Sequence, residues 1–123
     1  MTKFRNFLGI LAALILLLSS LAHSLLGWPN IRAQLEAAHA PADLITGLQI
    51  GWQFGGVAMV VFAAITAAVF IARMRGQQVS AFAPLVIAIA YLAFGTWALV
   101  ATRNPFFAIF IAPAVLLLVA SPS

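Results

Sequence analysis

The sequence predicts an all-α, polytopic membrane protein with four transmembrane helices and a short outer interfacial helix between the first and the second. Of the 123 residues, 65% are hydrophobic and only 7% are charged, whereas about a quarter of the residues in a soluble domain are charged. The apolar residues form runs long enough to cross a membrane, and most basic residues lie at the ends of these runs. We therefore expect a single four-helix transmembrane domain over residues 1–123.

The first predicted span covers residues 7–28 and ends at Pro29, because proline interrupts a helix. A basic start followed by the small residues of Ser20-Leu21-Ala22 is also typical of a cleavable signal peptide. The apolar run continues beyond this point to Trp28, which favours an uncleaved membrane helix.

The interfacial helix is predicted between residues 30 and 41. Asn30 can cap its start, and Arg32 and Glu36 are four residues apart, so that they can form an ion pair on its surface. We expect this short helix to lie on the outer face of the membrane.

The remaining predicted spans cover residues 44–72, 81–101 and 106–120. The second span is roughly 43 Å long at 1.5 Å per residue, which exceeds the hydrocarbon core, so it must tilt or extend beyond it. The fourth span is only about 22 Å long, with Asn104 as its N-cap and Pro105 as its first helical residue. A chain with three spans and a re-entrant tail is the alternative.

Basic residues in short loops mark the cytoplasmic side of a membrane protein. The two basic pairs, Lys3 with Arg5 and Arg73 with Arg75, therefore predict that both termini are cytoplasmic, and we expect the bacterial inner membrane. Tryptophan residues gather at membrane boundaries, and in this topology three of them lie near the outer ends of their spans: Trp28, Trp52 and Trp97.

Polar residues within the predicted spans lie almost entirely in their outer halves. In the first span they share one helical face, formed by Ser19, Ser20, His23 and Ser24. Together with the other spans they define a tentative ligand-binding cluster of His23, Gln53, Tyr91 and Thr96. A quinone or a lipid headgroup would need only a few such donors, and haem would need a second axial ligand. The preferred interpretation is a histidine that bridges helices through Gln53, Thr96 or Tyr91.

Several chemistries find no support in the sequence. No Asp or Glu lies within a predicted span, so a proton-coupled carrier and a catalytic triad both lack their carboxylate. There is no cysteine, and the two histidines and two acidic residues do not have the spacing of metal ligands. The basic residues form no stripe interleaved with aromatic residues, which argues against nucleic-acid binding. We expect no catalytic residues and no metal site, and no cofactor can be named.

Small residues recur along the second span and predict helix packing at Gly47, Gly51, Gly55, Ala63 and Ala67. Gln49 and Gln53 lie on the other side of the same helix, so this span should have protein on two sides. The primary hypothesis is a non-catalytic accessory or assembly subunit that packs against another membrane protein or against itself. The alternatives are an outer-leaflet binding protein for a quinone, lipid or haem, and a homo-oligomeric transporter.

Overall fold

The computed structural model describes residues 2–122, and this part of the chain is all-helical, as predicted. The elements in order are α1 (Thr2–Ala22), the short π-helix η1 (His23–Gly27), α2 (Trp28–Ala37), α3 (Ala42–Met74), α4 (Phe82–Thr102), the 3-10 turn η2 (Pro105–Phe107) and α5 (Ala108–Ala120).

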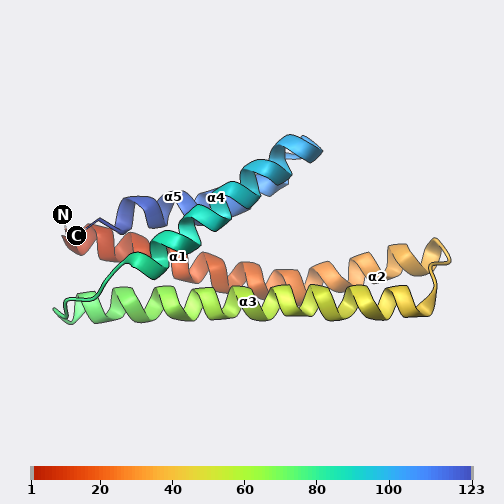
Figure 1. The fold of residues 1–123 in the computed structure, drawn as a ribbon, viewed down its shortest axis with the longest axis horizontal. Coiled ribbons are helices and arrows are strands. Elements are labelled where there is room, and N and C mark those ends of the chain that lie inside the picture. The colour runs from red at the N-terminus through yellow and green to blue at the C-terminus, as the bar shows by residue number, and fades with distance from the viewer. Residues whose placement is uncertain (1, 123) are drawn as a thin grey trace.

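Elements α1, η1 and α2 follow one another without a break and form one long rod (Figure 1). The prediction that Pro29 ends the first helix is therefore wrong, and so is the prediction that Asn30 caps a separate one. Residues 30–37 extend the rod instead of starting a new helix. The ion pair predicted on this segment is confirmed, because Arg32 Nε lies 2.8 Å from Glu36 Oε1 and both side chains are exposed.

Helix α3 returns alongside this rod in the opposite direction (Figure 1). It has 33 residues and is slightly longer than the predicted span 44–72. It ends where Gly76 adopts a positive φ of 79°, a conformation that suits a residue without a Cβ atom. The Gln77 amide then bonds to the Ala72 carbonyl oxygen at 3.0 Å, which closes the last turn.

Helices α4 and α5 form a second, shorter antiparallel hairpin (Figure 1). The predicted cap at its turn is confirmed, because the Asn104 side chain accepts a hydrogen bond from the Phe106 amide at 3.0 Å and Pro105 occupies the first turn. That first turn is a 3-10 turn, and α5 proper has 13 residues. A Cβ atom at Gly95 would lie 2.9 Å from Phe110 Cβ, so the two helices approach closely at this glycine.

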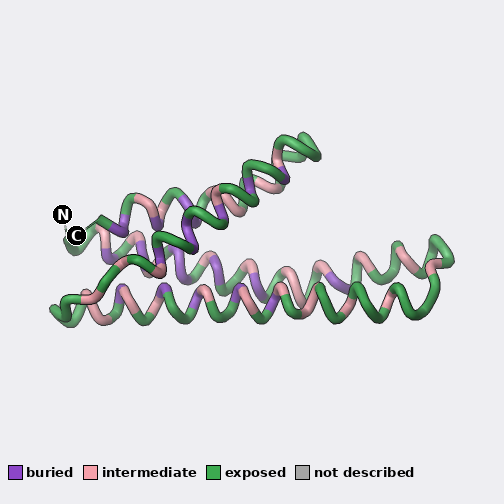
Figure 2. Tube along the Cα trace, viewed as in Figure 1, coloured by how far each residue is buried: buried purple, intermediate pink, exposed green. Residues whose placement is uncertain are grey.

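The two hairpins meet near one end of the molecule and diverge toward the loop between α4 and α5 (Figure 1). We call the end where they meet the terminal end, because it holds the first turn of α1, the loop 75–81, Ser121 and Pro122. Buried residues are concentrated in this half, whereas α2 and the start of α3 are mostly exposed (Figure 2). Four helices contribute to the core, with Leu16, Phe70 and Leu117 completely buried.

Within residues 2–122, three helices are long and apolar enough to cross a membrane: the continuous helix Thr2–Ala37, α3 and α4. The fourth apolar segment, Pro105–Ala120, is shorter. In each long helix only 28% of the most apolar window is buried within the chain, so most of its apolar surface faces outward. These features indicate an integral membrane protein.

Candidate functional site

His23, at the start of η1, and Trp52, on α3, are joined through both their rings and their backbones. The two rings stack with centroids 4.3 Å apart and planes inclined by 2°. Trp52 Nε1 donates a hydrogen bond to the His23 carbonyl oxygen at 2.7 Å, and His23 Nε2 lies 2.9 Å from the Trp52 carbonyl oxygen. Because a carbonyl oxygen only accepts, Nε2 must carry the hydrogen of this second bond. The two residues therefore fix α3 to the rod reciprocally.

The wide turn of η1 lies directly before Pro29 and explains how the helix continues past it. Proline has no amide hydrogen, and in a regular α-helix its ring collides with the carbonyl four residues earlier. In η1 the Trp28 amide bonds to the His23 carbonyl five residues back. This wider turn shifts the carbonyls before Pro29 away from the positions at which the proline ring would collide with them. The His23 carbonyl therefore accepts from both Trp28 and Trp52, using both of its lone pairs. Sequence reasoning missed this segment.

Glycines of α3 allow the polar face of the rod to come close. Ser20 Oγ donates to the Gly56 carbonyl oxygen at 3.0 Å. A Cβ atom at Gly56 would collide with Ser24 Oγ, and one at Gly55 would lie 3.3 Å from His23 Nε2. The polar face formed by Ser20, His23 and Ser24 is therefore the face by which the rod contacts α3.

The predicted packing row on α3 is divided between covered and open positions. Ala63 is buried and Ala67 is half-buried, while Gly55 contacts His23. At Gly47 and Gly51, by contrast, no atom lies within 4 Å of the place a Cβ atom would occupy. The Gly47–Gly51 part of the row is therefore not used within the described chain.

The residues predicted to surround His23 lie in different places. Tyr91 belongs to the core, with its ring centroid 6.2 Å from that of Phe62 and 6.1 Å from that of Phe110. Its hydroxyl group is buried without a hydrogen-bond partner among residues 2–122. Thr96 is exposed on α4 and lines a shallow, mostly apolar groove of about 690 Å³ that also includes Trp97.

The predicted cluster of four is therefore not assembled around His23. In the part of the chain that the structure describes, α4 makes no close backbone contact with α1 or η1, which separates Tyr91 and Thr96 from His23. Gln53 is half-buried beside Trp52. The expectation that His23 bonds to Gln53, Thr96 or Tyr91 is corrected, because its partner is the Trp52 backbone. Side-chain patterns could not reveal a carbonyl as that partner.

This arrangement is suited to holding two helices together. The His23 Nε2 hydrogen bond to the Trp52 carbonyl oxygen would have to break before that nitrogen could bind an iron atom or a ligand. Among residues 2–122, no group of three or more His, Asp and Glu side chains is placed to hold a metal ion. Comparison with protein-family models, with curated proteins and with solved structures gives no significant match.

Proposed function

We propose that the chain is a small, non-catalytic accessory subunit of a membrane protein assembly, held to its partner by helix packing. The observation that carries the proposal is the open face of α3 beyond the His23–Trp52 pair, where a Cβ atom added at Gly47 or Gly51 would meet no atom of another element among residues 2–122 within 4 Å. Beside them, Ile50 and Phe54 are 68% and 73% exposed. Small residues four apart beside large apolar ones let a second membrane helix approach the backbone closely.

The divergence of the two hairpins supports the same function. The outer part of α3 has little cover within the chain, and α4 leaves the long hairpin as it runs toward its loop (Figure 1). A helix from another membrane protein, or from a second copy of this chain, would add packing that the single chain lacks. At this level of α3, burial of exposed apolar side chains such as Ile50 and Phe54, together with close van der Waals packing, favours such association.

For the membrane placement we propose four crossings, with η2 and α5 as the short fourth. Along their helices, Arg5 and Trp28, and likewise Trp52 and Arg73, are separated by about 31–35 Å at 1.5 Å per residue, close to a hydrocarbon thickness of about 30 Å. The tryptophans would mark the outer boundary and the arginines the inner one, with both termini cytoplasmic in a bacterial inner membrane. Helix α2 and the start of α3 would then project from the outer surface, so a helix packed on Gly47 and Gly51 would meet this chain at the outer boundary and just beyond it.

This orientation can be tested by cysteine labelling, since the chain has no cysteine of its own. Gln34 lies on α2 and Gln77 in the loop after α3, and both are exposed. On intact cells, an impermeant thiol reagent should label Gln34→Cys and leave Gln77→Cys unlabelled. Both variants should react after the membrane is permeabilised. Labelling of Gln77→Cys alone on intact cells would reverse the proposed orientation.

Partner binding can be separated from folding by two matched glycine substitutions. Gly51→Leu adds a side chain where the chain itself leaves open space, so the partner should be lost while the stability of the isolated subunit is unchanged. Gly55→Leu places the same side chain against His23, so this variant should lose stability. Native mass spectrometry from mild detergent reports partner and stoichiometry, and thermal unfolding reports stability. A Gly51→Leu variant that keeps its wild-type partner would refute the proposed packing face.

A further inference from the structure

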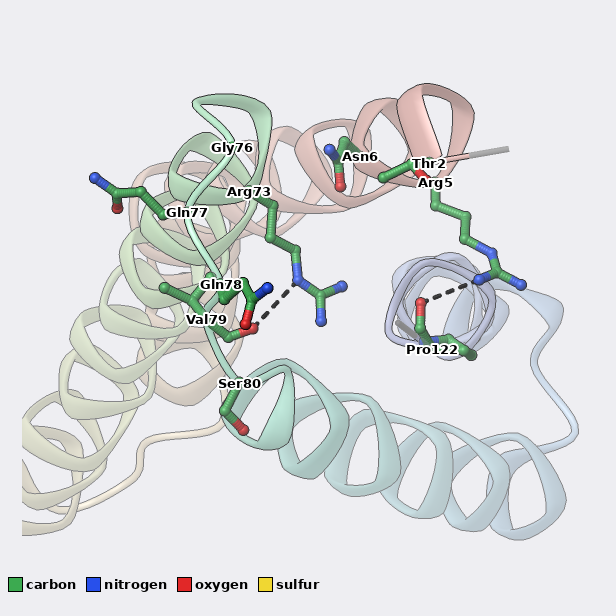
Figure 3. A pocket seen from close by; sticks show the side chains of 10 residues that line it. All are labelled: Thr2, Arg5, Asn6, Arg73, Gly76, Gln77, Gln78, Val79, Ser80 and Pro122. Carbon is green, nitrogen blue, oxygen red and sulfur yellow. Dashed lines mark hydrogen bonds between the residues drawn. The ribbon is translucent and has the colours of Figure 1, made fainter.

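A cavity of about 660 Å³ opens at the terminal end of the bundle, in a region that the proposed function does not use. The first turn of α1, the end of α3, the loop before α4 and the residue after Ser121 all contribute to its lining (Figure 3). Sites for small molecules have volumes of about 300–1,000 Å³, so this space can hold a headgroup-sized ligand.

Two arginines, Arg5 and Arg73, line this terminal cavity. Both acidic residues of the chain, Glu36 and Asp43, lie at the opposite end of the long hairpin, so no carboxylate side chain faces these guanidinium groups. Positive charges that are partly removed from water without an anion are unfavourable. The terminal cavity therefore lacks a counter-ion among its described side chains.

Among residues 2–122, the hydrogen bonds of the two arginines all go to backbone carbonyl oxygens. Arg73 Nη1 donates to the carbonyl oxygens of Ala120 and Ser121 at 3.5 and 3.3 Å, and its Nε to that of Val79 at 3.4 Å. Arg5 Nη1 donates to the Pro122 carbonyl oxygen at 3.2 Å. These bonds are at or beyond the long end of the usual range, and each guanidinium has five N–H groups, so donors are left for a ligand.

Uncharged polar groups complete the lining. Asn6 is 5% exposed and lines the cavity. Figure 3 shows it extending from α1 on the same side of the cavity as Arg73. Ser80 Oγ accepts from the Phe82 amide at 3.1 Å and can still donate its own hydrogen. Guanidinium, amide and hydroxyl donors around one space are the groups that bind phosphate oxygens.

We propose that the terminal cavity binds the phosphate group of an anionic phospholipid. The arginines lie about 31–35 Å from the tryptophan level of the same helices at 1.5 Å per residue, which in the membrane placement proposed above is where the headgroup layer meets the hydrocarbon. Basic pockets between membrane helices at this depth are suited to anionic headgroups. The acyl chains would lie along the exposed apolar sides of the helices, which water-soluble phosphate cannot use.

The test compares nanodiscs of phosphatidylcholine with nanodiscs that also contain phosphatidylglycerol, using native mass spectrometry to detect retained lipid. We expect the wild type to retain phosphatidylglycerol, with affinity lowered at least about tenfold in Arg5→Gln and in Arg73→Gln, since each loses a charge-assisted bond. Arg75→Gln is the matched control, because Arg75 is exposed at the same end and does not line the cavity. Arg73→Lys keeps the charge and tests whether a folding defect causes the loss.

Three results would overturn the proposal. The first is equal retention of phosphatidylglycerol by the wild type and by both Arg5→Gln and Arg73→Gln. The second is an equal loss in Arg75→Gln, which would indicate general attraction to an anionic surface. The third requires a further arm in which inorganic phosphate is added to the phosphatidylcholine nanodiscs. Retention of phosphate there, without retention of phosphatidylglycerol in the mixed nanodiscs, would assign the cavity to free phosphate.

Discussion

Gly9→Ala is expected to lower the free energy of unfolding by about 1–3 kcal/mol, although alanine is normally the better helix former. A methyl group at position 9 would collide with the ring of Phe70, which lies over the Gly9 backbone. Phe70 is completely buried, and the guanidinium carbon of Arg73 lies 5.7 Å from its ring centroid. Because the ring has little space into which it can turn, α1 would have to move away from α3.

Unfolding in mixed micelles by a denaturing detergent measures this effect. Gly51→Ala is the control, since the same substitution there meets no atom within 4 Å and should leave stability unchanged or raised. Adding Phe70→Leu to Gly9→Ala should recover part of the loss, because the smaller side chain makes room for the methyl group. If Gly9→Ala proved as stable as Gly51→Ala, the contact between Gly9 and Phe70 would not determine how closely these helices approach.

Helix existence was predictable because it depends on local chemistry. The lengths of the apolar runs placed the long helices, and Asn104 with Pro105 placed the start of the last one. The prediction that the helix ends at Pro29 is wrong because a wider turn accommodates the proline here. The divergence of the two hairpins was not predictable, since every apolar face of a membrane helix can be covered equally well by lipid or by protein.

The candidate site was predictable only where it depends on the chemistry of a single side chain. An ionisable side chain in an apolar helix requires a partner, so His23 could be singled out from the sequence. Its partner is a backbone carbonyl, and every helical residue carries one, so composition gives no preference for Trp52 over its neighbours. The close approach at Gly55 and Gly56 was visible as a glycine pattern, but the pattern does not distinguish contacts within the chain from contacts with a partner.

The pairing of His23 with Trp52 makes the two residues interdependent. His23→Leu removes the ring stack and the hydrogen bond to the Trp52 carbonyl, and Trp52→Leu removes the stack and the bond to the His23 carbonyl. An aromatic pair and one hydrogen bond together correspond to about 1–3 kcal/mol, which is the expected loss of unfolding free energy in each single variant. The double variant should lose less than the sum, because both single variants abolish the same stack.

Stability and bound small molecules have to be measured on the same samples, by detergent unfolding and by native mass spectrometry. Since the geometry is that of a helix bridge, we expect His23→Leu to lose stability while it retains any small molecule that the wild type carries. Gln53→Leu is the control, because Gln53 lies beside the pair without bonding to His23, and its stability should be unchanged. If His23→Leu kept full stability but lost a bound molecule, His23 would be a ligand-binding residue, and the outer-leaflet binding function would replace the accessory-subunit proposal. Additive losses in the double variant would show that the two rings do not support each other, and the bridge would have to be sought in Ser20 and Gly56 instead.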